Sequence, residues 1–222
     1  MLNYLAMKNR SKNDTHIKYL VTNEQDKSWG ITVNSVGFQS IGPGKAYPPA
    51  NHPAQYLFSP SSGRTLDEYQ LIYTVRGQGT FTSASHRGTT IKAGYMYMLF
   101  PGEWHSYKPD PETGWDEYWI GFQGRNIDAR REEQFFQQQR PFFRVGIQAE
   151  IVKLFELAIN TARDQKVGFQ QRLGGTANMR LGYANYQEKN SLFEDSAVGK
   201  QNNEAKNISR DTRKGGKKRE AI

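Results

Sequence analysis

The stretch that decides the fold runs from residue 69 to residue 81 and reads Tyr-Gln-Leu-Ile-Tyr-Thr-Val-Arg-Gly-Gln-Gly-Thr-Phe. Side chains alternate between the two faces of a strand, so the apolar odd-numbered members from Tyr69 to Val75 share one face. The even-numbered members from Gln70 to Arg76 share the other face and are more polar. Gly77-Gln78-Gly79 then predicts a turn into another short strand at residues 80–82.

Further strand-like runs flank this stretch on both sides. Upstream, residues 31–38 alternate with a register change at Asn34-Ser35, which predicts a β-bulge. Residues 42–63 carry five prolines and predict a long irregular connection. Downstream strands are expected at residues 95–100, 104–108 and 117–123, with a turn at residues 85–88. Several short strands with closely spaced turns predict an antiparallel barrel or a double-sheet jelly roll.

The apolar period becomes helical after Pro141. Residues 147–162 carry one apolar stripe, which predicts an amphipathic helix that Gly168 would end. A weaker helix is expected over residues 169–188, although it contains three glycines that each cost about 1 kcal/mol relative to alanine. Asn178 and Arg180 interrupt its apolar face. This second helix therefore needs a partner surface, inside the chain or on a second subunit.

The composition is that of a globular protein. The chain has 222 residues, of which 36% are hydrophobic and 13% aromatic, enough for a sizeable core. It has no cysteine, which excludes disulfides, thiolate metal sites and cysteine nucleophiles. No apolar run reaches the roughly 20 residues of a membrane span. The apolar start is too short for a signal peptide, so we expect a cytoplasmic protein.

The formal net charge of +8 is concentrated at the C-terminal end. Residues 200–222 hold eight basic and three acidic side chains, whereas residues 1–199 hold only three more basic than acidic ones. Two interpretations are open: a basic arm that binds nucleic acid, or a solvated terminus. We favour the second, because this tail has few apolar side chains to offset the entropy of ordering.

One segment resembles a known sequence motif. Gly94 to His105 resembles the second cupin motif, in which a strand ends in Pro-Gly and the next strand begins with an inward histidine. In metal-binding cupins that histidine joins two histidines and a glutamate of a first motif. The corresponding stretch here, residues 67–81, contains no histidine. We therefore expect no metal and no cofactor, and His105 is either a hydrogen-bonded barrel residue or a ligand contact.

A wider set of motifs resembles the N-terminal sensor domain of AraC-family transcription regulators. The resemblance covers roughly residues 28–196. The matching segments are Ser35–Gln39, Tyr47–Pro49 with His52-Pro53, Gly63–Tyr73, Arg76–Gly79, Leu99–His105, Pro109–Phe122, Phe142–Arg144 and Phe193–Asp195. The resemblance implies a cupin-like antiparallel β-barrel that binds a small effector, often a sugar, followed by helices that form a homodimer. It also implies a separate helix-turn-helix domain that binds DNA.

The resemblance also implies a set of ligand-binding residues. Pocket contacts of the arabinose regulator correspond to Arg64, Tyr107 and Trp119, and a histidine of the family is replaced by Glu117. A sugar is compatible with these residue types, because aromatic faces stack on the apolar face of a pyranose and Arg, Glu and His bond its hydroxyls. Other interpretations stay open: Trp119 as barrel packing, and Arg64 in a surface ion pair with Asp67 or Glu68.

These observations predict four segments. They are an N-terminal arm (1–27), a cupin-like effector-binding barrel (28–125), linker and dimerisation helices (126–195) and a basic, disordered tail (196–222). Only 26 residues follow Ser196, against about 100 for a DNA-binding domain of this family, so we expect a regulator truncated before that domain. We expect a sensor and not an enzyme; the alternative is a metal-dependent, sugar-modifying cupin enzyme with Glu117 and His105 as acid and base.

Overall fold

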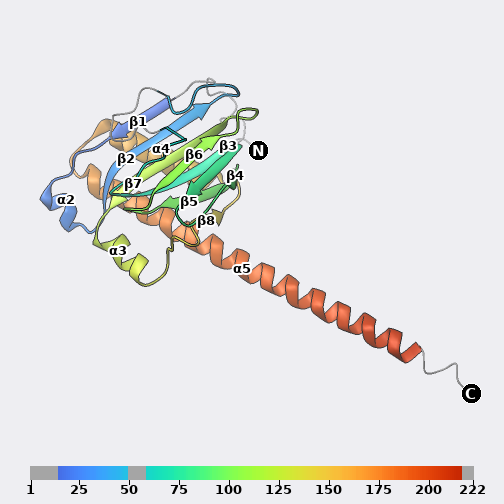
Figure 1. Ribbon diagram of the computed structural model, residues 1–222. Coiled ribbons are helices and arrows are strands. Elements are labelled where there is room, and N and C mark those ends of the chain that lie inside the picture. Colours follow the sequence, from blue (N-terminus) through green and yellow to red (C-terminus); the bar gives the residue numbers. More distant parts are fainter. Residues whose placement is uncertain (1–14, 50–58, 217–222) are drawn as a thin grey trace, which may run out of the picture.

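The computed structural model describes residues 15–49 and 59–216, with side chains described as far as residue 193. A β-barrel is flanked by helices on one side, and one long helix extends away from it (Figure 1). The strands are β1 (Thr15–Tyr19), β2 (Thr32–Ile41), β3 (Tyr69–Ser83), β4 (Thr89–Lys92), β5 (Tyr95–Leu99), β6 (His105–Pro109), β7 (Trp115–Gln123) and β8 (Phe142–Arg144). The helices are α2 (Glu24–Ser28), α3 (Arg125–Glu132), α4 (Ala149–Asp164) and α5 (Phe169–Gly216). The predicted antiparallel barrel with C-terminal helices is confirmed.

Strand β3 belongs to both layers of the barrel. Its first part pairs with β5 and β7, and its second part pairs with β4 and β6. A register shift between Thr74 and Arg76 and the positive φ of Gly77, 73°, bend the strand between the two. A side chain at position 77 would collide with the carbonyl of Gly114. The predicted turn at residues 77–79 is therefore wrong: the chain bends there, yet its pairing continues as one strand.

The strands have apolar side chains on both faces and so contribute to two cores. One core lies between the sheet and helices α4 and α5 and includes Tyr73, Tyr118 and Phe155. The other fills the inside of the barrel and includes Ile72, Tyr107 and Trp115. The alternation predicted for β3 is confirmed, since Tyr73 and Ile72 belong to different cores. The predicted bulge in β2 is confirmed as a register shift between Val33 and Ser35.

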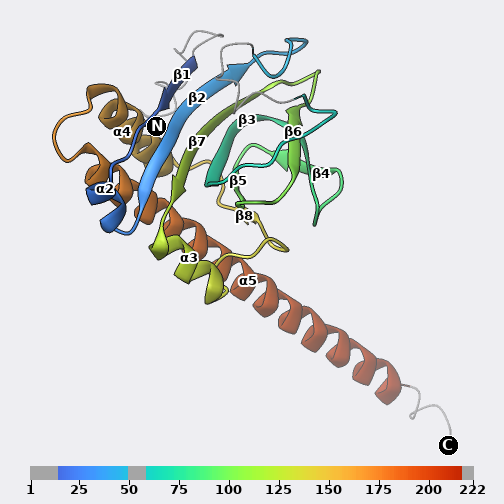
Figure 2. The same cartoon turned by 60° about the vertical axis from the view of Figure 1, so that its left-hand side comes forward.

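Helices α4 and α5 lie against the outer side of β2 (Figure 2). The predicted inner stripe of α5 is buried as expected at Leu173, Ala177, Leu181 and Ala184. The two residues that interrupt the stripe have partners: Asn178 accepts a hydrogen bond from Arg130 of α3 at 2.8 Å, and Arg180 lies over the ring of Phe155. Asn178 and Arg180 thus connect α5 to helices α3 and α4.

The structure draws several boundaries differently from the sequence. Helix α4 ends at Gln165, which has a left-handed conformation, three residues before Gly168. Helix α5 continues through Gly216, where the sequence predicted a disordered tail from residue 196. That segment mixes good helix formers such as lysine, alanine and arginine with asparagine and glycine, so helix propensity alone does not explain the continuation. None of the helices in the described ranges is long and apolar enough to span a bilayer.

Two strands of the barrel come from segments that the sequence predicted to lie outside it, the N-terminal arm and the linker. Strand β1, in the expected arm, pairs along β2 from Thr15 opposite Gln39 to Tyr19 opposite Ser35. Strand β8, in the expected linker, pairs with β5. The two strands have only five and three residues, too few for a recognisable alternation, which is why neither was predicted. Residues 1–14 of the arm and 217–222 of the tail lie outside the described residues.

Candidate functional site

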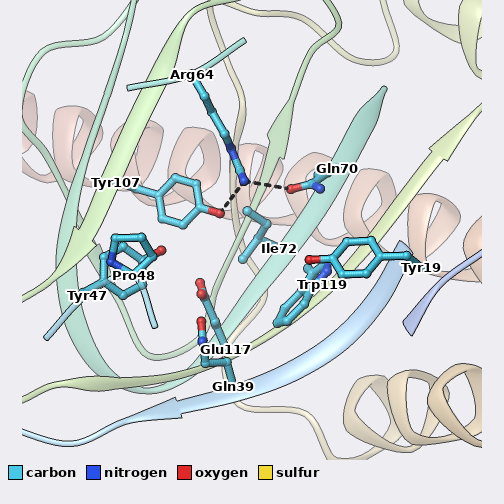
Figure 3. Close-up of a pocket in the computed structure, with 10 residues that line it drawn as sticks. All are labelled: Tyr19, Gln39, Tyr47, Pro48, Arg64, Gln70, Ile72, Tyr107, Glu117 and Trp119. Atoms are coloured by element: carbon cyan, nitrogen blue, oxygen red, sulfur yellow. Dashed lines mark hydrogen bonds between the residues drawn. The ribbon is translucent and has the colours of Figure 1, made fainter. Parts of the chain in front are cut away.

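An enclosed cavity inside the barrel gathers the polar side chains that the sequence singled out. It lies among β1, β2, β3, β6 and β7 (Figure 3). Its lining residues are Tyr19, Gln39, Tyr47, Pro48, Arg64, Gln70, Ile72, Tyr107, Glu117 and Trp119. Arg64 and Gln70 lie at one end and Glu117 and Gln39 at the other, with aromatic rings on both sides between them (Figure 3). The arrangement is a slot with aromatic walls and polar ends.

Arg64 is held in place by its backbone and by its side chain. Its backbone exchanges two hydrogen bonds of 2.9 Å with His105, which fixes it beside the start of β6. Its guanidinium donates through Nη2 to the hydroxyl of Tyr107 at 2.9 Å and reaches Oε1 of Gln70 at 3.5 Å. The guanidinium points into the cavity (Figure 3). These contacts account for the position of Arg64 without the surface ion pair with Asp67 or Glu68.

His105 lies behind Arg64 and not among the lining residues. It is buried, and Nε2 accepts a hydrogen bond from Nε of Arg64 at 3.2 Å. Burial, and secondarily the charge of Arg64, lower its pKa to about 4, so the ring is neutral at pH 7. Nδ1 then carries the proton and donates to the carbonyl of Glu103, 3.1 Å away. His105 thus orients Arg64 and has no nitrogen left for a ligand or a metal.

A second layer of polar residues orients Gln70. Its amide nitrogen donates to Oε1 of Glu68 at 2.9 Å, which turns the amide oxygen toward Arg64. Glu68 is buried and also accepts from the hydroxyl of Ser35. Burial raises the pKa of Glu68, while the hydrogen bonds from Gln70, Asn34 and Ser35 oppose that rise. The chain from Glu68 through Gln70 to Arg64 fixes the donors at this end of the cavity.

Glu117 faces Arg64 across the cavity. It is almost completely buried, and its Oε2 has no hydrogen-bond partner among the described residues. Burial raises its pKa to about 8, with the charge of Arg64 acting in the opposite direction. A buried acceptor without a partner is costly, so this carboxyl group favours an occupant that donates a hydrogen bond.

Two tryptophans of β7 are accommodated by glycines on neighbouring strands. Trp119 lies opposite Gly37 of β2, where any Cβ would collide with the indole. Trp115 lies against Gly79 of β3 in the same way. The absence of these two side chains gives the indole rings room inside a narrow barrel.

The five residues predicted as ligand contacts converge on this site. Arg64, Tyr107, Glu117 and Trp119 line the cavity, and His105 supports Arg64 from behind. Sequence reasoning missed Gln39 and Gln70, although their inward positions follow from strand alternation. It also missed Tyr19 and Tyr47, which reach the cavity from an edge strand and an irregular segment. No local pattern marks those two residues. Within residues 15–49 and 59–193, no three histidine or acidic side chains form a group that could hold a metal ion.

Comparisons with known proteins agree with this geometry. The sequence profile of the AraC-like ligand binding domain matches residues 43–178. The raffinose operon transcriptional regulatory protein RafR of Pediococcus pentosaceus is 39% identical over 64 residues, which are 28% of this chain and 23% of that protein. The chain thus aligns with about a quarter of its curated relative.

Solved cupin structures give weaker matches. The Escherichia coli protein YhaK is 11% identical with a TM-score of 0.36, over 50% of this chain and 45% of that one. An RmlC-like cupin with a double-stranded β-helix fold from Methanocaldococcus jannaschii is 11% identical with a TM-score of 0.34, over 55% and 90% of the two chains.

Proposed function

This chain belongs to the AraC-like ligand-binding domain family, and on that premise we propose that it is the effector-sensing and dimerisation part of a transcription regulator. The proposed effector is a neutral sugar or sugar derivative. The proposed role is non-enzymatic and takes place in the cytoplasm. DNA contact in such a regulator comes from a helix-turn-helix domain, and the described residues contain none.

The observation that carries this proposal is the slot between Arg64 and Glu117. Aromatic rings of Tyr107 and Trp119 flank it, and such rings stack on the apolar face of a pyranose (Figure 3). Arg64 donates hydrogen bonds at one end, and the unpartnered oxygen of Glu117 accepts them at the other. A sugar hydroxyl both donates and accepts, so a polyol ring satisfies both ends at once.

Charge favours a neutral effector over an acidic one. A carboxylate or phosphate near Arg64 would lie in the same small cavity as Glu117, which burial already disfavours in its charged form. An ionised effector would itself lose its hydration on entering the cavity, at the same kind of cost. Neutral saccharides avoid it.

A binding panel tests the proposal. Raffinose, melibiose, galactose, sucrose and arabinose are titrated by calorimetry beside galacturonate and galactose 6-phosphate; raffinose comes first because of the raffinose operon regulator among the relatives. We expect saturable binding of at least one neutral sugar, weakened at least tenfold by Arg64→Ala and by Trp119→Ala. Arg163→Ala, on the exposed side of α4, is the matched control. A protein that binds no saccharide contradicts the proposal.

The same samples test the non-enzymatic role. We expect the bound sugar to be recovered unchanged, as followed by NMR over hours. Support comes from His105, whose two ring nitrogens are both engaged by neighbours. Turnover of the sugar, or stoichiometric iron, manganese or zinc by elemental analysis, would favour the cupin enzyme instead.

Dimerisation is proposed through an exposed stripe of α5. Within the stripe, Gly175, Met179, Gly182 and Tyr186 follow one another at spacings of four, three and four residues, and Phe193 lies two helical turns further on. Met179, Tyr186 and Phe193 are between 63% and 74% exposed, which is unusual for large apolar side chains. Gly175 and Gly182 have open space beside them, so a second helix can approach closely. A second copy of this chain presents the same apolar spacing and is the proposed occupant.

A further inference from the structure

Tyr47 lines the candidate ligand site on the side of Tyr107 (Figure 3). The residue as a whole is partly exposed, whereas its hydroxyl end is enclosed within the barrel. Its ring lies 5.8 Å from that of Trp115, edge-on, and 6.2 Å from that of Tyr107. Burial raises the pKa of its hydroxyl well above the usual value, and the charges that act on it belong to Tyr107, Glu117, Tyr97 and Arg64. The phenol ring therefore fills the space among the predicted ligand contacts.

The space left in the cavity is too small for a sugar. Its volume is about 30 Å³, room for about one water molecule, whereas ligand sites usually span at least about 300 Å³. The strand-borne walls are fixed by continuous pairing of β2, β7 and β3. Tyr47 is carried instead by the irregular segment after β2, whose residues 43–46 are exposed. Of the described lining residues, Tyr47 and Pro48 are the two held by neither a strand nor the backbone bridge between Arg64 and His105, and the side chain of Tyr47 is hydrogen-bonded to Tyr107.

Four buried polar atoms of this part of the barrel lack hydrogen-bond partners among the described residues; those of Tyr97, Trp115 and Glu117 belong to residues beside Tyr47, and Thr74 lies next to Glu117. The four atoms are Thr74 Oγ1, Tyr97 OH, Trp115 Nε1 and Glu117 Oε2. The sheet registers bring them together: Thr74 lies opposite Glu117, and Trp115 is two residues along β7 on the same face. Tyr97 lies opposite Ile72 on β5, and its ring is 6.1 Å from that of Tyr107.

These atoms include donors and acceptors, so an occupant with hydroxyl groups can satisfy them. Tyr47 itself satisfies none of the four, because each remains without a partner while the phenol ring is in place. Leaving buried polar groups unpaired is costly, and the cost disappears when a polyhydroxylated ring replaces the phenol.

We propose that the effector ring takes the place now held by the Tyr47 side chain, which makes Tyr97 and Trp115 ligand-binding residues and Tyr47 a built-in competitor of the ligand. The inference rests on the proposed carbohydrate effector. The ligand class is a neutral ring bearing hydroxyls, whose donors reach Glu117 and whose acceptors reach the Trp115 indole. The closed form lowers the apparent affinity in proportion to its population.

One substitution tests the inference by the direction in which it changes the affinity for sugar. Tyr47→Ala removes the competitor, so we expect the dissociation constant for the sugar found in the panel to fall about tenfold by calorimetry. Tyr47→Phe keeps the ring and is the matched control, with an affinity within about threefold of the unsubstituted chain. If Tyr47 were an ordinary contact residue, truncating it would instead raise the dissociation constant, because a contact to the sugar would be lost. Unchanged or weaker binding by Tyr47→Ala overturns the proposal.

Trp115→Phe supplies a second, independent readout. It keeps an aromatic ring and removes the unpartnered donor, so we expect at least fivefold weaker sugar binding by the folded variant, while urea unfolding without sugar measures the separate cost of the smaller ring in the core. Unchanged binding by this variant also overturns the proposal. If the unsubstituted chain binds sugar and Tyr47→Ala binds it less well, only this inference fails. If neither chain binds any saccharide, the carbohydrate assignment fails and the inference with it.

Discussion

Single glycines determine where the two tryptophans of the candidate site can lie. Gly37 and Gly79 are strand residues, where glycine is normally unfavourable, yet a Cβ at either position would collide with an indole ring. The cost of glycine in a strand is offset by the packing of Trp119 and Trp115 inside a narrow barrel. The conformation of these tryptophans therefore depends on residues distant in the sequence.

We expect Gly37→Ala to displace the Trp119 indole, because the new methyl group has no space beside it. Overpacking of this kind costs about 1–3 kcal/mol, measured as the free energy of unfolding in urea, and sugar affinity should fall with it. Gly42→Ala is the control, since a Cβ there meets only the side chain of Lys45, at an ordinary 3.7 Å. Gly37→Ala with unchanged stability and affinity would contradict the assigned role of Trp119.

Glu117 gives the protein a distinctive dependence of stability on pH. Its pKa is raised from 4.5 to about 8 in the folded chain, so between these values the folded state binds a proton that the unfolded state has released. Stability therefore falls as pH rises through this window, by at most about 1.4 kcal/mol per pH unit. His105 acts at lower pH, because its lowered pKa of about 4 reduces stability as pH falls below 6.5.

Glu117→Gln removes this dependence. We expect the free energy of unfolding of the variant to be flatter than that of the unsubstituted chain between pH 6.5 and pH 8, in urea titrations without sugar. Parallel curves for the two proteins in that window would show that Glu117 is ionised in the folded state at neutral pH. The comparison needs no ligand and so tests the electrostatics of the site by themselves.

Two residues that are unusual for their elements, Gly77 in β3 and Arg180 in α5, determine how those elements pack. The bend in β3 at Gly77 carries one strand through both layers, so that Ile72 and Phe81, on either side of the bend, both belong to the core inside the barrel. On α5, Arg180 looks like a break in an apolar stripe. It is completely buried between α4 and α5, donates to the carbonyl of Leu154 and lies 4.2 Å from the centre of the Phe155 ring.

Arg180 is buried without an acidic partner among the described residues, which lowers the stability of the folded chain. Its pKa is lowered to about 9 by burial, and Nε and Nη1 have no partner in the described part of the chain. We expect Arg180→Met to raise the free energy of unfolding by about 1 kcal/mol, because an apolar side chain of similar length fills the space without unpaired donors. Arg180→Ala should lower it by about 2 kcal/mol by leaving a cavity. A large loss of stability in Arg180→Met would show that the guanidinium has partners of its own.

The molecule as a whole combines a barrel that holds the site with a helix that extends far beyond it (Figure 1). The site lies within the barrel, whereas the exposed apolar stripe lies on α5. Both α4 and the start of α5 pack on β2, whose inward residue Gln39 lines the cavity. The proposed ligand site and the helices that carry the proposed dimer interface therefore share one strand.

The dimer proposal is tested by placing charge on the stripe. We expect the unsubstituted chain to sediment as a dimer and Met179→Glu with Tyr186→Glu to sediment as a monomer, because two carboxylates would be buried against their symmetry copies. Asn160→Glu on the exposed face of α4 is the charge-matched control and should leave the dimer intact. A dimer that persists with both substitutions would show that the interface does not include this stripe.

The sequence by itself determined the fold class, most strand positions, the bulge in β2 and the inner stripe of α5. These features depend on alternation and helical period, which are local properties of the chain. It also identified Arg64, Tyr107, Glu117 and Trp119, since a resemblance of motifs preserves their order. It missed the strands recruited at both edges, the continuous bend at Gly77 and the helix beyond residue 196.

Only the tertiary structure decided what these residues do to one another. His105 became a support for Arg64, Gly37 made room for Trp119, and Tyr47 entered the cavity from an irregular segment. Arg64 and His105 are 41 positions apart, Gly37 and Trp119 are 82 apart, and Tyr47 and Tyr107 are 60 apart. The raised pKa of Glu117 likewise follows from its burial in the folded barrel. Burial and cross-strand contact are properties of the closed barrel, so no local pattern of residues encodes them.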